Sequence, residues 1–152
     1  MNPDQVRNLC VEILREGPDI VSTAGWTDGS RRPSGLLVLF SSGARLWTGI
    51  TTSDPAGPEA RDYAPATPSP LPDLYDDARR ITPSRVEGYL AAVLAGARAP
   101  QITGAYSYSV TARHPGVGLY LAGGARAFLP FVYAAASGKD PAVRPFTIDS
   151  TF

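Results

Sequence analysis

The sequence predicts an α+β domain that is internally duplicated as αβββ–linker–αβββ, with two helices packed on an antiparallel sheet. Three observations lead to this prediction. The pentapeptides GARLW and GARAF, at 43–47 and 124–128, lie 81 positions apart, each after an apolar run. Two helical patterns repeat at an offset of 80, and two alternating patterns repeat at an offset of 82. We interpret the repeat as architectural, with a pseudo-two-fold axis relating the two units.

Each predicted helix begins at a recognisable cap. Asn2 is a suitable N-cap, Pro3 occupies the first helical position, and Gln5 stands where a capping box places it. Thr82 and Pro83 mark the second start in the same way. Apolar residues then follow with the spacing i, i+3, i+4, i+7 and i+8, which is typical of one helix face. They are Val6, Leu9, Cys10, Ile13 and Leu14 in the first helix, and Val86, Tyr89, Leu90, Val93 and Leu94 in the second.

A strand is predicted after each helix, because polarity there alternates with period two. In the second unit the face that we expect to take the helix consists of Ile102, Gly104, Tyr106, Tyr108 and Val110. The first unit matches at an offset of 82, which pairs Ile20 with Ile102 and Trp26 with Tyr108.

A hairpin is predicted next in each unit, over 35–52 and 116–134. Its turn, Ser42-Gly43 or Gly123-Gly124, has the small residues of a two-residue turn. Pairing Ser41 with Ala44 sorts the side chains into two apolar faces, so a second cover is expected from the other unit, the linker or another subunit. One face holds Leu36, Val38, Phe40, Arg45 and Trp47, and its counterpart holds Val117, Leu119, Leu121, Arg126 and Phe128. Gly49 and Pro130 correspond and indicate a bulge or an edge.

We expect a single domain, 1–152, made of two repeats. The first αβββ repeat covers 1–52, a Pro-rich linker covers 53–81, the second repeat covers 82–136, and a C-terminal tail covers 137–152. Six prolines in the linker favour extended polyproline conformation. Residues 73–80 are expected to form one or two helical turns, and the tail to add a short strand or to lie over a groove.

Charge and composition argue against several classes of protein. Lys and Arg number 14, and so do Asp and Glu, so the chain lacks the positive charge that binding to a phosphate backbone requires. Cys10 is the only cysteine, which excludes an intrachain disulfide and suits a buried thiol in a reducing compartment. The first ten residues lack the pattern of a signal peptide, so we expect a cytoplasmic protein. The apolar stretch 116–137 contains Arg126 and Pro130 and is interpreted as a buried hairpin rather than a membrane span.

Five residues are candidate binding residues: Arg45, Trp47, Arg126, Phe128 and His114. Each arginine adjoins a hairpin turn and has an aromatic residue two positions on, a pattern suited to binding a carboxylate or phosphate. The alternative is that the arginine stem only covers apolar surface. His114, the only histidine, precedes a Pro-Gly turn and is either an exposed loop residue or a general base without an identified nucleophile. We identify no catalytic residue, no metal site and no cofactor motif.

The predicted function is therefore that of a non-catalytic intracellular binding protein, such as an adaptor, a scaffold or an inhibitor-type partner. It would contact a protein partner, or a second copy of itself, through sheet and hairpin surfaces. One alternative is a small-ligand-binding protein or enzyme with a site between the two repeats around His114. A further alternative is a single-stranded nucleic-acid binder in which Trp26, Tyr106 and Tyr108 stack on bases.

Overall fold

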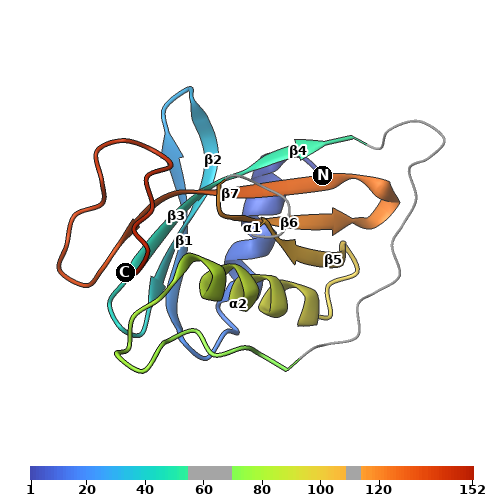
Figure 1. Ribbon diagram of the computed structural model, residues 1–152. Coiled ribbons are helices and arrows are strands. Elements are labelled where there is room, and N and C mark those ends of the chain that lie inside the picture. Colours follow the sequence, from blue (N-terminus) through green and yellow to red (C-terminus); the bar gives the residue numbers. More distant parts are fainter. Residues whose placement is uncertain (55–69, 109–113) are drawn as a thin grey trace.

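The computed structural model describes residues 1–54, 70–108 and 114–152, and these form two α-helices and seven strands (Figure 1). The first half of the chain contains α1 (Pro3–Leu14), β1 (Ile20–Asp28), β2 (Arg32–Phe40), β3 (Arg45–Gly49) and β4 (Thr51–Ser53). The second half contains α2 (Pro83–Gly96), β5 (Ile102–Ser107), β6 (Gly116–Leu121), the 3₁₀ turn η3 (Ala122–Gly124) and β7 (Arg126–Ala135). The predicted α+β class is confirmed.

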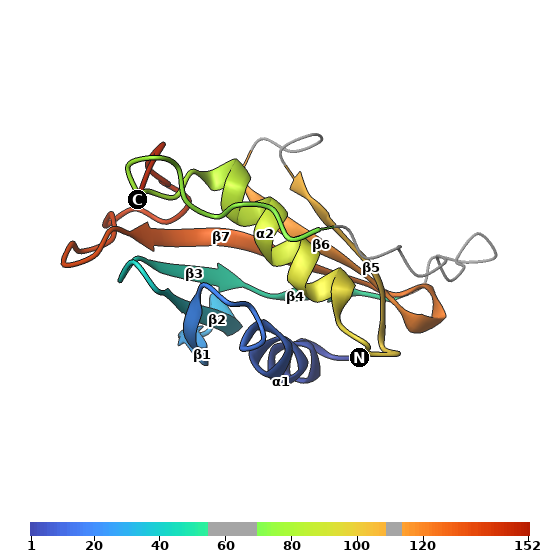
Figure 2. The same cartoon turned by 90° about the horizontal axis from the view of Figure 1, so that it is seen from below.

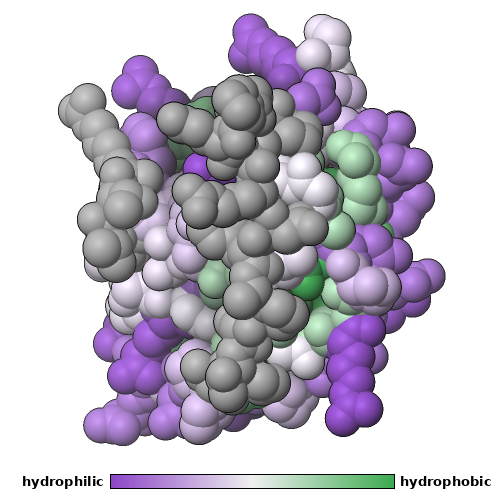
Figure 3. Space-filling model, turned by 90° about the vertical axis from the view of Figure 1, so that its right-hand side faces the viewer, coloured by the Kyte–Doolittle hydropathy of each residue, from purple (hydrophilic) through white to green (hydrophobic). Residues whose placement is uncertain are grey.

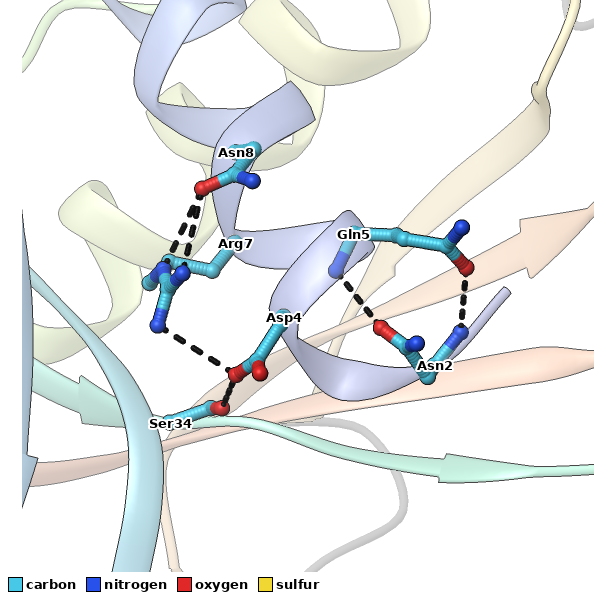
Figure 4. Close-up of polar contacts among 6 residues, drawn as sticks. All are labelled: Asn2, Asp4, Gln5, Arg7, Asn8 and Ser34. Atoms are coloured by element: carbon cyan, nitrogen blue, oxygen red, sulfur yellow. Dashed lines mark hydrogen bonds and ion pairs between the residues drawn. The ribbon is translucent and has the colours of Figure 1, made fainter.

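Helix α1 begins with the predicted capping box, drawn in Figure 4. The Asn2 side chain accepts the backbone N–H of Gln5, and the Gln5 side chain accepts the backbone N–H of Asn2, both at 2.9 Å. Asp4 in the first turn accepts hydrogen bonds from Ser34 on β2 and from Arg7. The cap therefore satisfies exposed backbone donors of the helix, and Asp4 ties this end of α1 to the sheet.

Helix α2 begins at the predicted cap, where the Thr82 hydroxyl accepts the backbone N–H of Arg85 at 3.3 Å. The helix packs on β5 and β6, whereas α1 packs on β1 and β2, and the two helices touch each other. The Tyr89 hydroxyl of α2 accepts the backbone N–H of Asp19, just before β1. This bond joins the second half of the chain to the first.

The strands form one antiparallel sheet in the order β1-β2-β3-β7-β6-β5, with β4 pairing the other end of β7. The two halves of the chain meet where β3 and β4 lie along β7, which we call the central seam. Figure 2 shows α2 in front of the β5–β7 part of the sheet and α1 beside β1 and β2. Each half thus contributes one helix and three consecutive strands in the same order, and the first half adds the short strand β4.

Corresponding irregularities occur in both halves. Val21 is the extra residue of a bulge between β1 and β2, and Thr103 is the extra residue of a bulge between β5 and β6, at an offset of 82. At the central seam β3 and β4 are interrupted at Ile50, and β7 shifts register opposite Trp47 and Thr48. The irregular seam agrees with the expectation for Gly49 and Pro130. Descent of the two halves from one duplicated unit stays a prediction.

The core lies between the helices and the inner face of the sheet. Buried strand residues alternate, as in Leu36, Val38 and Phe40 of β2, and they form one continuous cluster with the apolar stripes of both helices. Most stripe residues are buried as predicted, including Cys10 and Leu94. Both halves therefore share one core, and the division into a single domain of two repeats stays a prediction.

The predicted register of the hairpins was wrong by one residue. The Phe40 N–H bonds to Ala44 O, so the turn contains three residues, and Leu39 rather than Phe40 pairs with Arg45. Gly43, at a φ of 90°, provides the left-handed conformation that such a turn needs. Because a one-residue slip moves every side chain to the other face, Arg45 and the alternate residues after it lie opposite the core.

The second hairpin is shifted in the same way. Leu121 N–H bonds to Ala125 O, and Tyr120 pairs with Arg126. Arg126 and Phe128 therefore lie on the face of Tyr120, not with Leu119 and Leu121 as predicted. The expectation that Tyr106 faces the helix was also wrong, because the bulge at Thr103 returns Ile102 to the core and turns Gly104 and Tyr106 outward. Val110 lies outside the described residues.

The segment that leads into α2 forms a turn rather than the expected helical turns. Tyr75 and Ile81 pair as an isolated bridge, and the Asp76 carboxylate accepts the backbone N–H groups of Ala78 and Arg80. These bonds lower the pKa of Asp76. Residues 55–69, which include most of the predicted Pro-rich linker, lie outside the described part of the chain. The C-terminal tail ends at a buried Phe152, whose backbone pairs with Ile81 in both directions.

Candidate functional site

The candidate site is the sheet face opposite the helices, which we call the outer face. Its positions follow from the strand register. They are Ser22, Ala24, Trp26, Gly35, Leu37, Leu39, Arg45, Trp47, Gly49, Thr51, Ser53, Gly104, Tyr106, Gly116, Gly118, Tyr120, Arg126, Phe128, Pro130, Tyr133 and Ala135. The large side chains among them are all partly exposed, in contrast to the buried inner face. Four of the five predicted binding residues lie here, and only His114 is not among these strand positions.

Aromatic rings on the outer face lie over glycines of the neighbouring strand. The ring of Trp26 lies over Gly35, and the ring of Tyr106 lies so close to Gly118 that a Cβ there would overlap it. Tyr108, just beyond β5, lies over Gly116 in the same way, 2.6 Å from the position of a Cβ. Each glycine therefore gives a ring room to lie close to the sheet, which keeps the ring in place without burying it fully.

Arg126 lies among three aromatic rings at one end of the outer face. Its guanidinium carbon is 5.0 Å from the ring centre of Tyr120 and 5.4 Å from those of Tyr106 and Phe128. One terminal nitrogen donates a hydrogen bond to the Tyr106 hydroxyl at 2.6 Å. The Nε atom is buried and has no hydrogen-bond acceptor among the described residues. We call Arg126, Tyr106, Tyr120 and Phe128 the Arg126 cage.

Arg45 lies at the other end of the outer face. Its guanidinium carbon is 5.0 Å from the Trp47 ring, and a terminal nitrogen donates to the backbone carbonyl of Lys139 at 2.5 Å. Tyr133 contacts Trp47 and Trp26 edge-on, with ring centres 6.4 and 6.0 Å apart. Arg45 with its neighbouring rings thus resembles the Arg126 cage. One N–H group of Arg45, however, already donates to a backbone carbonyl.

The charged side chains of the outer face include two arginines without a described ion pair. Arg45 and Arg126 are the charged residues among the positions named above. Asp28 and Arg32, the next pair of β1 and β2 beyond Trp26 and Gly35, neutralise each other in an ion pair. The described ion pairs, Arg7 with Asp4 and Arg32 with Asp28, do not involve either arginine. Among the described residues the outer face therefore has two more positive than negative side chains, although the chain as a whole has no net charge.

The structure places His114 apart from the two arginines in its described contacts. The side chain is exposed, and its ring centre lies 5.9 Å from that of Phe146 in the tail, on whose ring Arg32 also stacks. Phe146 has a φ of 63°, which is unusual for a residue other than glycine. A pocket of about 260 Å³ lies beside it, lined by Arg31, Arg32, Pro33, Ser34, Gly49, Ile50, Thr51, Pro130 and Phe146.

Sequence reasoning missed one buried carboxylate. Glu87 of α2 has no exposed surface, and its Oε2 accepts the backbone N–H groups of Tyr108 and Gly116, both at 3.0 Å. These groups lie on either side of residues 109–113, which are outside the described part of the chain. The only signal in the sequence is that Glu87 adjoins the apolar stripe at Val86. Glu87 holds the end of β5 to the start of β6, and its contacts suit a structural role.

Burial also sets the chemistry of the other ionisable groups near the core. It raises the pKa of the Cys10 thiol to about 12 and that of the Tyr89 hydroxyl to about 12. Burial, reinforced by the nearby Tyr106, raises the pKa of Tyr108. These groups therefore stay protonated near neutral pH, and none of them is prepared as a nucleophile or base.

Other features of the described residues add no second site. No three His, Cys, Asp or Glu side chains among them are grouped to hold a metal ion. Neither helix in the described part of the chain is long and apolar enough to cross a membrane. A pocket of about 330 Å³ between the end of α1 and residues 97–101 is lined partly by Glu12, Glu16 and Arg98. Figure 3, which shows the right-hand side of the molecule, has hydrophilic residues around most of its coloured rim.

Comparison with protein-family models, with curated proteins and with solved structures finds no match to this chain.

Proposed function

We propose that the protein is a non-catalytic binding protein that takes a protein partner on its outer face. The observation that supports this proposal is the concentration of partly exposed Trp, Tyr, Phe and Arg side chains on one sheet face. These residue types are enriched at protein interfaces and at their energetic centres, because they bury large areas with little loss of side-chain freedom. The helices cover the inner face, which leaves the outer face as the larger surface for a partner or a second copy of the chain.

The pocket beside Phe146 favours the alternative of a small-ligand-binding protein as a second candidate function. It lies close to the central seam, between residues of both halves, and His114 touches the same phenyl ring. The described contacts join neither a nucleophile nor a second base to His114, so an enzyme has less support than a binding protein. The rings of the outer face also suit stacking on bases, but the neutral net charge argues against a nucleic-acid partner.

Affinity capture with matched variants tests the proposal. Trp47→Ala removes a partly exposed ring of the outer face, and Val143→Ala, at a side chain that is 98% exposed in the tail, serves as a control for truncation elsewhere. We expect Trp47→Ala to weaken capture of a specific partner by about ten-fold or more, as truncation of an anchoring tryptophan does. The control variant should capture the partner as the wild type does.

Circular dichroism and thermal melting show whether each variant retains the native fold. Size-exclusion chromatography over a range of concentrations distinguishes a second copy of the chain from another protein. Equal capture by wild type and by a folded Trp47→Ala, Leu39→Asp double variant contradicts the proposal, since both positions lie on the outer face. Capture of nucleic acid that depends on Trp47 supports the nucleic-acid alternative instead.

A further inference from the structure

We propose that the Arg126 cage anchors a carboxylate side chain of an extended acidic segment in the protein partner, and that Arg45 receives a second carboxylate of the same segment. This inference rests on the proposed function, because it specifies the chemistry of the partner that the outer face accepts. It assigns the two arginines different strengths as anchors.

Arg126 forms no ion pair within the described part of the chain. A guanidinium carries five N–H donors, and the described contacts use one of them, on the Tyr106 hydroxyl. Nε is buried without an acceptor, and no carboxylate among the described residues pairs with the side chain. A partly buried charge without a counter-ion is unfavourable, so a carboxylate that arrives at the terminal nitrogens gains more here than at a solvated arginine.

The guanidinium of Arg126 is held in a fixed position. Three rings surround it at 5.0 to 5.4 Å, and the ring of Tyr106 is itself placed by the absence of a side chain at Gly118. A donor group that is already in place loses little conformational freedom when it binds. Arg45 should be the weaker anchor for a carboxylate, because it has one ring neighbour and already donates to the Lys139 carbonyl.

The two arginines lie at opposite ends of β7. Arg126 begins β7, and Arg45 pairs with Ala135 at the end of the same strand. At about 3.3 Å per residue, the nine steps along β7 separate the two sites by about 30 Å. Side chains of an extended segment point to the same side at every second residue, so the two carboxylates should be about eight or ten residues apart.

The charge of the outer face favours a carboxylate-bearing protein over a nucleic acid. A phosphate would also bind arginine, but nucleic-acid affinity grows with the number of phosphates neutralised along the chain. The described outer face offers two arginines without an ion pair, Arg45 and Arg126, at its two ends, on a molecule with no net charge. Two separated anchors with apolar rings between them fit a segment that has acidic ends and an apolar middle.

The test uses short fluorescein-labelled peptides and fluorescence anisotropy at low salt. The main probe carries two glutamates about eight residues apart with Leu and Ser between them, and its matched control carries glutamine at both places. A third peptide places the two glutamates next to each other. We expect the spaced acidic peptide to bind about ten-fold more tightly than the glutamine peptide, with the third peptide between them.

Variants of the full chain assign the effect to residues. Arg126→Met should weaken binding of the spaced acidic peptide by about ten-fold, and Arg126→Lys by less, because lysine keeps the charge but not the planar fork. Arg45→Met should weaken it by about three-fold, as expected for an arginine already bonded to a carbonyl. Arg98→Met, at an exposed arginine beside the end of α2, is the matched control and should bind as the wild type does.

Three results overturn this inference. The first is equal binding of the acidic and glutamine peptides, or no binding of either. The second is unchanged binding by a folded Arg126→Met variant. The third is Arg126-dependent binding of an oligothymidine in place of the peptide, which points to nucleic acid. If partner capture still depends on Trp47 while Arg126→Met has no effect, the proposed function stands and the acidic anchor fails.

Discussion

Burial determines the chemistry of Cys10. The thiol has no exposed surface and lies in the apolar stripe of α1, and burial raises its pKa to about 12 from an ordinary 9.0. We expect Cys10→Ser to lower the free energy of unfolding by about 1–3 kcal/mol, because a hydroxyl would be buried in place of the thiol. Denaturant unfolding followed by circular dichroism measures this change. Rapid labelling of the native thiol by a bulky reagent would contradict the burial.

The buried thiol of Cys10 should also make the free energy of unfolding depend on pH. Folding raises the pKa of Cys10, so the folded state is favoured while the thiol remains protonated in both states. As pH rises above the unfolded value of 9.0, the unfolded chain loses its proton first, and the stabilising contribution is lost progressively towards pH 12. The free energy of unfolding should therefore fall above pH 9 less steeply in Cys10→Ala than in the wild type, a difference that urea titrations at several pH values can detect.

Replacement of Glu87 should destabilise mainly the end of β5 and the start of β6. Its carboxylate accepts two backbone N–H groups in a site without solvent exposure. Glu87→Gln can keep a carbonyl oxygen for both N–H groups but loses the negative charge that strengthens the two hydrogen bonds, so we expect a loss of about 1–3 kcal/mol. Hydrogen exchange should become faster at Tyr108 and Gly116 and stay unchanged at Asp19. Uniform acceleration over the whole sheet would show that the effect is global.

At the level of elements, replacing the glycines under the aromatic rings by alanine should lower the free energy of unfolding by different amounts. A side chain at Gly118 meets the far end of the Tyr106 ring, which can swing away, whereas one at Gly35 meets the backbone carbonyl of Thr48. We expect Gly118→Ala to cost about 1–2 kcal/mol and Gly35→Ala about 3 kcal/mol, because overpacking against backbone is harder to relieve. Thermal melts of the two variants compare them. Gly118→Ala should also disturb the Arg126 cage, which changes the near-ultraviolet spectrum of the tyrosines.

The elements themselves were predictable, but their register was not. Caps at Asn2 and Thr82 and the apolar spacing that follows are local signals, so both helices were predicted correctly. The register depends on whether a turn holds two or three residues, and Ser-Gly is compatible with both. The bulges at Val21 and Thr103 likewise leave no mark in the alternation of polarity. One residue of slip at each hairpin separated Arg45 from Phe40 and Arg126 from Leu121, with which they had been grouped, and the bulge at Thr103 turned Tyr106 from the expected helix face to the outer face.

At the level of the whole molecule, this slip explains why the candidate site was predicted only in part. Arg45, Trp47, Arg126 and Phe128 were identified singly from their spacing after each turn. Their grouping with residues of other strands, Trp26, Tyr106, Tyr120 and Tyr133, depends on pairings between strands far apart in sequence. Local patterns do not determine such pairings, so the outer face could be recognised only once the sheet was known.

The repeated strand order and the matching bulges make the duplication testable. Superposing residues 3–51 on 83–132 in an experimental structure should align both helices and three strands, in the same order. The bulges at Val21 and Thr103 should coincide, because both lie at the same offset from the helix before them. Alignment of one helix with loss of register in the strands would instead indicate two unrelated α+β units of similar size.

The central seam makes the last prediction, that both halves unfold together. One core cluster spans both helices, and β7 pairs with strands of the first half near both of its ends, through β4 and β3. Trp26 and Trp47 report on the first half by fluorescence, while the near-ultraviolet circular dichroism of Tyr106, Tyr108 and Tyr120 reports mainly on the second. The two signals should give coincident denaturation curves.

Phe131→Ala, at a fully buried seam residue, should shift both curves by the same amount, with a loss of about 3–5 kcal/mol. If the tyrosine signal changes at a lower denaturant concentration than tryptophan fluorescence, the second half unfolds on its own and the seam does not couple the halves.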